Sequence, residues 1–108
     1  MTKSERDRLS RLKEMPCVAC GRYGVDIHHL VDNGYRRLSG GHMATIPLCA
    51  WHHRGEPLAD VTVRATKELL GPSLARHKRE FVARFGTERE LLEKVNDLII
   101  ATGGHLKW

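Results

Sequence analysis

Two short cysteine and histidine motifs, far apart in the sequence, most constrain how this 108-residue chain can fold. Cys17 and Cys20 form a C-x-x-C motif, and Cys49 and His52 form a C-x-x-H motif. A C-x-x-C turn directs two thiolates at one ion, and a second pair from a distant segment completes a tetrahedral shell without an open position. We therefore interpret these four residues as a structural zinc site.

The alternative interpretation is a buried or reactive thiol pair with an unrelated third cysteine. The chain has three cysteines, and this odd number argues against a disulfide framework, as does the lack of a secretory hydrophobic segment in the first thirty residues. Hydrophobic residues make up 41% of the chain and aromatic residues 6%, so the expected core is modest and a metal ion would supplement it. A zinc site accounts for all three cysteines, so we favour it over the thiol-pair interpretation.

The charge balance favours a polyanionic partner. Lys and Arg number 18 and Asp and Glu number 13, which gives a net charge of +5 and a pI near 9.4. Nucleic acid is the first candidate and an anionic membrane surface the second. No apolar run approaches the ~18 residues of a membrane-spanning helix, so we do not expect a membrane protein.

Basic side chains that we consider for phosphate contacts lie in several segments. Arg36 and Arg37 lie on a polar loop, and Arg54 follows the second metal motif. The alternative for each is a solvated surface residue without a ligand. Further basic residues lie on the predicted N-terminal and late helices: Arg6, Arg8, Arg11, Lys13, Arg76, Lys78 and Arg79.

The pattern in the first half predicts a helix, a hairpin and a helical turn. Apolar residues three apart predict a helix over 3–15, which Pro16 ends. Strands are predicted over 25–31 and 43–48, and they pair across a polar, glycine-containing loop. A helical turn is expected over 49–54.

The second half is predicted to be helical. Leu74, Phe81, Val82 and Phe85 share a helical face between Pro72 and Gly86, and Thr87 with Glu90 forms a T-x-x-E capping box ahead of an amphipathic helix that ends near Gly103. We expect one domain over 1–108, made of a basic N-terminal helix or arm (1–15), a metal finger (16–60) and a helical part (61–102). The fold class is α+β.

Three further histidines lie beside the metal motifs. His28 and His29 are adjacent in a predicted strand, and His53 follows His52. Successive strand residues point to opposite faces, so His28 and His29 cannot both bind one ion from a regular strand. This favours one imidazole as a metal ligand and its neighbour as a base, against the alternative of ordinary core or surface histidines.

Together these motifs resemble a known family. The order C-x-x-C, His-His, a glycine-containing loop and Ile-Pro-Leu-Cys-x-x-His-His resembles the ββα-metal (treble-clef-like) finger of HNH endonucleases. Several segments resemble more specifically the phage Ref proteins, which are RecA-dependent nucleases that enhance recombination. These segments are Thr45 to Cys49, His53 to Gly55, Gly71 to Ala75, Phe85-Gly86 and Glu90 to Leu92. The resemblance covers about residues 16–95.

The resemblance implies a metal-dependent endonuclease that hydrolyses phosphodiester bonds of DNA. His28 and His53 would bind the catalytic Mg²⁺ or Mn²⁺, and His29 would be the general base that activates water. An imidazole suits that role because much of it is unprotonated at neutral pH. The resemblance also implies a zinc-stapled fold, DNA and a RecA filament as partners, and a phage or prophage protein in the cytoplasm of a bacterial host.

The sequence departs from the HNH pattern at two positions. Pro57 stands where many HNH helices have a further histidine, so Asp60 is our choice for the third ligand of the catalytic ion, with His77 as the second choice. Ala44 stands where the family's central asparagine is expected. His42 lies nearby, and it either orients the base or is a surface residue.

Two other functions fit the same cysteines and charge. One is a non-enzymatic zinc module that binds DNA or protein. The other is a second closed zinc site, formed by His28, His53 and other side chains, with no position for water. A purely structural module has no need of three further imidazoles beside a closed site, so the enzyme is favoured.

Overall fold

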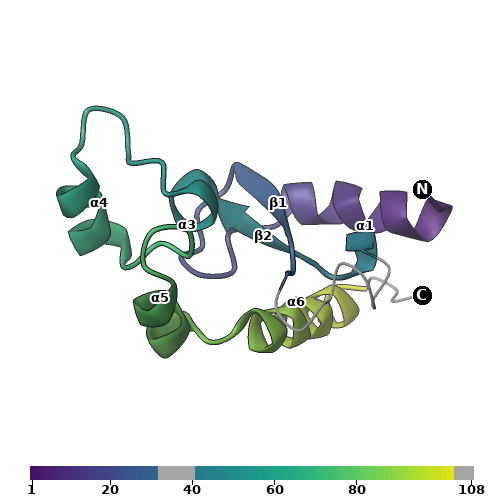
Figure 1. Cartoon of the computed structure of the whole chain (residues 1–108). Coiled ribbons are helices and arrows are strands. Elements are labelled where there is room, and N and C mark those ends of the chain that lie inside the picture. The colour runs from purple at the N-terminus through teal and green to yellow at the C-terminus, as the bar shows by residue number, and fades with distance from the viewer. Residues whose placement is uncertain (32–40, 104–108) are drawn as a thin grey trace.

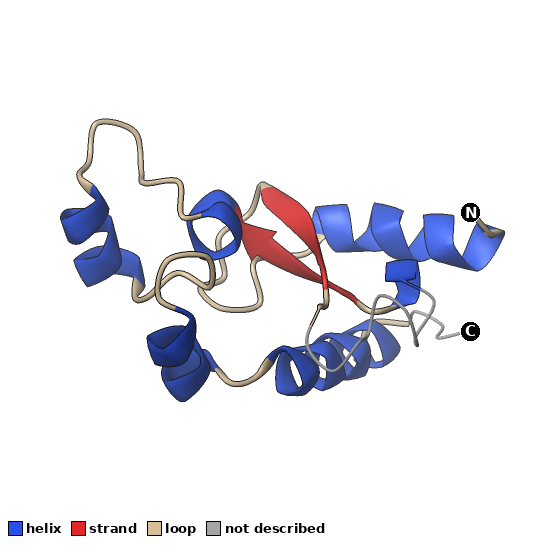
Figure 2. Ribbon diagram, in the orientation of Figure 1, coloured by secondary structure: helices blue, strands red, loops and turns tan. Residues whose placement is uncertain are grey.

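A computed structural model describes residues 1–31 and 41–103 of the chain. Two strands form an antiparallel hairpin, and helices lie on either side of it (Figures 1 and 2). The elements are α1 (Lys3–Glu14), β1 (Val25–His29), η2 (Gly41–Met43), β2 (Thr45–Cys49), α3 (Ala50–Arg54), α4 (Val63–Leu70), α5 (Lys78–Phe85) and α6 (Glu88–Ala101). This is the small α+β fold expected from the sequence, with β1, β2 and α3 in ββα order.

The hairpin is shorter than its predicted length. Val25 pairs with Cys49 and His29 pairs with Thr45, so β1 ends at His29 and not at Val31. β2 begins two residues later than predicted, because residues 41–43 form the single turn η2. In this turn the Ala44 N–H donates to the Gly41 carbonyl at 3.0 Å. The register places Cys49 at one end of the ladder and His29 at the other.

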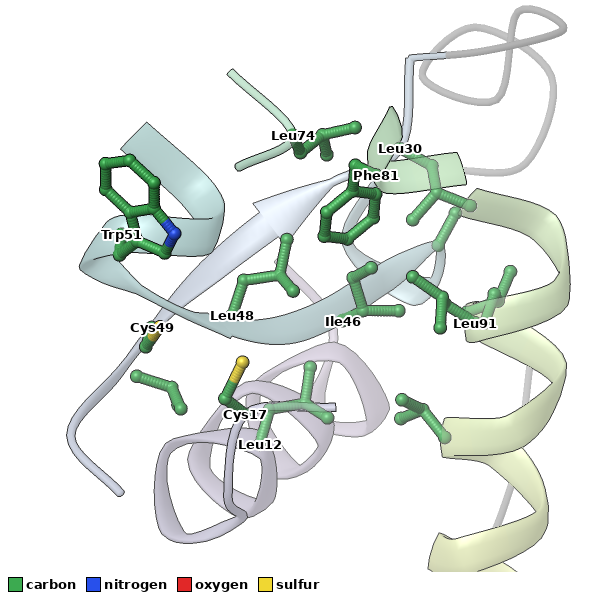
Figure 3. Packing of buried hydrophobic residues seen from close by; sticks show 14 of the residues in the cluster. Leu12, Cys17, Leu30, Ile46, Leu48, Cys49, Trp51, Leu74, Phe81 and Leu91 are labelled. Atoms are coloured by element: carbon green, nitrogen blue, oxygen red, sulfur yellow. The ribbon is translucent and has the colours of Figure 1, made fainter. Parts of the chain in front are cut away.

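Helix α1 packs against the hairpin and lies beneath the strands in Figure 3. A capping box of Thr2 and Glu5 starts the helix, and Met15, ahead of Pro16, is its C-cap, close to the predicted end. Leu12 is fully buried beside Cys17 in the core. The predicted N-terminal helix is therefore confirmed.

One of the basic residues of α1 is buried, which corrects the interpretation of Arg8 as a phosphate contact. Its guanidinium donates to Thr45 Oγ1 at 3.0 Å, to the Thr45 carbonyl at 2.7 Å and to Asn96 Oδ1 at 2.9 Å. Burial lowers the pKa of Arg8 to about 10, so the group stays charged at neutral pH. Arg8 thus ties α1 to β2 and α6.

We expect Arg8→Ala to lower the free energy of unfolding by about 3 kcal/mol, because hydrogen bonds to a charged group are lost and buried acceptors on Thr45 lose their donor. Urea unfolding of the zinc-loaded protein, followed by circular dichroism, measures this change. Arg6→Ala is the matched control, since Arg6 is exposed on the same helix and should change stability by less than about 0.5 kcal/mol. Equal midpoints for the two variants would contradict the role of Arg8.

The helical second half is confirmed, with one correction. Thr87 and Glu90 form the predicted capping box of α6. Leu74, however, does not share a helix with Phe81, because α5 begins only after His77. Leu74 lies in a separate turn, in which the His77 N–H donates to the Ser73 carbonyl at 2.8 Å. Leu74 still reaches the core, since its N–H donates to the His52 carbonyl at 3.0 Å.

A single hydrophobic cluster joins the hairpin to the helices (Figure 3). Trp51 and Phe81 are its largest fully buried side chains, and the indole N–H of Trp51 donates to the Gly71 carbonyl at 2.8 Å. Ile46 and Leu48 of β2 lie between α1 and the C-terminal helices. The core therefore holds the segments that carry the cysteines and histidines. In the described part of the chain, no helix has the length and apolar character needed to cross a bilayer.

Candidate functional site

The four predicted zinc ligands come together. The sulfur atoms of Cys17, Cys20 and Cys49 and a ring nitrogen of His52 all lie within 4.8 Å of one another. The Cys20 and Cys49 sulfurs are 3.8 Å apart, and His52 Nδ1 lies 3.3 Å from Cys49 Sγ and 3.8 Å from Cys17 Sγ. Tetrahedral bonds of about 2.0–2.3 Å require separations of this size. The cluster therefore fits a zinc ion.

The electrostatics of the cluster also favour a cation. Hydrogen bonds with Cys20 and Cys49 hold the pKa of the Cys17 thiol far below its usual range, whereas hydrogen bonds with Cys17 and Cys49 raise the pKa of Cys20 above its usual range. Burial lowers the pKa of His52, but Cys17 and Cys49 raise it by more, so that the net pKa is about 9. Zinc binds cysteines as thiolates, and a bound divalent ion offsets the repulsion between three thiolates at this spacing.

The orientation of His52 is fixed from outside the cluster. Its Nε2 atom lies 2.9 Å from the carbonyl oxygen of Leu70, at the end of α4, and therefore donates to it. Nδ1 is then the nitrogen that would bind a zinc ion, and it faces the sulfurs, as is typical of metal-bound histidines. The rings of Phe81 and Phe85 pack against His52 with centroids 6.0 and 5.2 Å away. No pattern in the sequence indicates the Leu70 contact.

His28 and His53 form a second cluster, beside the first. Their ring centroids are 5.2 Å apart at an interplanar angle of 66°. His53 Nδ1 lies 2.9 Å from Asp26 Oδ2, and Arg54 Nε lies 2.7 Å from the same oxygen. Partial burial raises the pKa of Asp26, but the hydrogen bonds from His53 and Arg54 outweigh it and keep that pKa below its usual value. Asp26 is therefore an ionised partner of His53.

A buried carboxylate contacts the other ring of this cluster. Glu88, the first residue of α6, is 2% exposed, and its Oε1 atom lies 2.5 Å from His28 Nε2. Glu88 is not predictable as a site residue from the sequence, because an acidic residue in the first turn of a helix is explained by the helix dipole alone. Only its burial, which depends on how α6 packs, distinguishes it.

His29 lies in a separate pair with His42. Its Nε2 atom is 2.9 Å from His42 Nδ1, and the ring centroids are 5.0 Å apart. The backbone of His42 is held in turn by Thr45, whose hydroxyl donates to the His42 carbonyl at 2.8 Å and also contacts Arg8. His42 thus contacts His29, and this contact places His29 apart from the pair formed by His28 and His53. A role of His42 in orienting the base stays a prediction.

The remaining predicted site residues lie elsewhere. Asp60 is exposed in a turn between α3 and α4, with a left-handed φ of 61°, and it is not part of the cluster of His28 and His53 in the described ranges. His77 Nδ1 accepts from the Ser73 N–H at 3.2 Å. The side chain of Arg54 is 54% exposed and pairs with Asp26 and Glu56. Arg36 and Arg37 lie outside the described residues.

The fold and these sites define a small α+β protein with a Cys3His cluster suited to zinc and an adjoining group of paired histidines and carboxylates. Over residues 1–100 the chain matches the model of a family described as recombination enhancement, RecA-dependent nuclease. The chain therefore belongs to this family of RecA-dependent nucleases. The match confirms the resemblance to Ref proteins that the sequence motifs indicated.

Proposed function

We propose that this protein is a metal-dependent DNA endonuclease of the HNH type, which acts with RecA in recombination. The observation that carries the proposal is the division of the adjacent histidines of β1. His28 lies beside His53 of α3, whereas His29 is paired with His42. A hydrolytic site needs a metal position and a separate base, and these two pairs supply one each.

His28 and His53 are the residues that would hold the catalytic Mg²⁺ or Mn²⁺. When bound, such an ion stabilises the negative charge that develops on the phosphate and on the leaving oxygen. Imidazole nitrogens and carboxylates are suitable ligands for these metals. The third ligand that we predict from the sequence, Asp60, stays a prediction, and the exposed turn that carries it would have to approach the two histidines.

His29 would accept the proton of the attacking water. A neutral imidazole has one donor and one acceptor nitrogen. Nε2 of His29 lies 2.9 Å from Nδ1 of His42, so one of these two nitrogens donates to the other. This contact would hold the ring of the base in place.

Contacts to DNA are proposed at Arg36, Arg37 and Arg54, in agreement with the net charge of +5. Arg54 is partly exposed beside His53, so a phosphate near the metal position would compete with Asp26 and Glu56 for its guanidinium. Contacts of this kind bind DNA without reading its sequence. A RecA filament would then supply the positioning of the substrate.

Cleavage of supercoiled plasmid and of single-stranded DNA, with Mg²⁺, Mn²⁺ or EDTA and with or without a RecA filament, tests the proposal. We expect nicking or linearisation that depends on the metal and is stimulated by RecA. If every substrate stays intact but is retarded on a gel, the chain is a DNA-binding zinc module instead. Cleavage that persists in EDTA would contradict the metal-dependent mechanism.

A further inference from the structure

We propose that Glu88 is a positioning residue for the metal site, and that it acts by holding His28 in one tautomer. This inference rests on the proposed function, because it assigns an atom of His28 to the catalytic ion. Glu88 belongs to α6, which lies outside the predicted finger, and it is 60 positions after His28 in the chain.

The contact between Glu88 and His28 is close and protected from solvent. The Oε1 to Nε2 distance is 2.5 Å, and the two side chains are 2% and 13% exposed. A buried carboxylate is costly unless it is paired, and an ionised carboxylate can only accept a hydrogen bond. His28 therefore donates its Nε2–H to Glu88, and Nδ1 is left as the nitrogen that can bind a metal.

The neighbouring histidine is held in the same manner by a different carboxylate. Asp26 accepts from Nδ1 of His53 at 2.9 Å, so Nε2 is the nitrogen of His53 that can bind a metal. The two rings are 5.2 Å apart, and each is held by a carboxylate through its other nitrogen. A metal-bound histidine usually donates its second ring N–H to such a group, which fixes the orientation of the ring.

The distance also decides between a positioning role and a role as a direct ligand. Two ligand atoms on one Mg²⁺ or Mn²⁺ ion with bonds of about 2.1 Å are about 3 Å apart in octahedral geometry. At 2.5 Å, Glu88 Oε1 and His28 Nε2 are closer than two ligand atoms of one such ion, and closer than is usual for an N–H···O hydrogen bond, so the two side chains contact each other directly. Glu88 therefore acts through His28.

The test uses the full chain loaded with one equivalent of zinc, titrated with Mn²⁺ by calorimetry. We expect Glu88→Leu to weaken Mn²⁺ binding by about 10–100-fold, the usual effect of removing an outer partner of a metal ligand. Glu88→Gln should keep most of the affinity, because its amide oxygen can still accept from Nε2. Glu93→Leu is the matched control, since Glu93 is exposed on the same helix, and its affinity should equal that of the wild type.

A second readout reports the tautomer directly. Imidazole ¹⁵N shifts of the metal-free second site should show His28 protonated on Nε2 in the wild type and a mixture of tautomers in Glu88→Leu. If Glu88→Leu does not fold, anomalous scattering from wild-type crystals soaked in Mn²⁺ still decides the question. We expect the ion on Nδ1 of His28, and an ion bonded to a Glu88 oxygen would overturn the positioning role.

The outcomes separate this inference from the proposed function. If the wild type binds Mn²⁺ and cleaves DNA while folded Glu88→Leu binds Mn²⁺ equally well, the role of Glu88 is wrong and the nuclease proposal stands. If the wild type binds no second ion and leaves DNA intact, the nuclease proposal fails, and with it the assignment of His28 Nδ1 to an ion.

Discussion

We expect His29→Ala to lower the rate of DNA cleavage by about 10²–10⁴-fold, the usual contribution of a general base, and to leave the fold and the zinc content unchanged. The reason is that His29 lies in its own pair with His42 and does not contact the cysteine cluster. Single-turnover cleavage of plasmid DNA under saturating Mg²⁺ measures the change. Circular dichroism and zinc content establish that the variant is folded.

Tyr23→Ala is the control for this experiment. Tyr23 also carries a ring, but it is exposed and is not among the residues proposed for the metal position, the base or DNA contacts. We expect it to cleave at the wild-type rate once corrected for folded protein. A folded His29→Ala variant with wild-type activity would show that the base is another residue.

We expect Cys17→Ser to lose one equivalent of zinc and to leave most of the protein unfolded at room temperature. A structural zinc site contributes about 10 kcal/mol of apparent folding free energy, whereas a domain of this size has only about 5–15 kcal/mol in total. Cys17 is buried between α1 and the hairpin, so a serine there neither binds zinc well nor packs as sulfur does. Elemental analysis and thermal unfolding measure both effects.

Chelation of zinc from the wild type should produce the same unfolded state, and Cys20→Ser should behave like Cys17→Ser. A Cys17→Ser variant that keeps a full equivalent of zinc and the wild-type midpoint of unfolding would contradict the Cys3His assignment.

The parts of this molecule that follow from local spacing were predictable from the sequence. The two metal motifs and the capping box of α6 each depend on residues a few positions apart, and the hairpin follows from two short strands separated by a glycine-containing loop. The observed ends of the strands differ from the predicted ends by one or two residues, because residues next to a strand can form a single turn such as η2.

Contacts between distant segments were not predictable in this way. Glu88 and Arg8 have the appearance of surface residues in the sequence, since both lie on amphipathic helices among other charged side chains. Their burial depends on how α1 and α6 pack on the hairpin, and no periodicity in a single segment reports that packing. The same holds for the Leu70 carbonyl that orients His52.

Helix α3 has a consequence for how this chain can vary. It is five residues long, and its adjacent residues His52 and His53 lie about 100° apart around the helix axis, so one faces the cysteines and the other faces Asp26. A one-residue insertion or deletion between Cys49 and His52 would turn both imidazoles away from their partners at once. We therefore expect a length change at this point to disrupt both sites together.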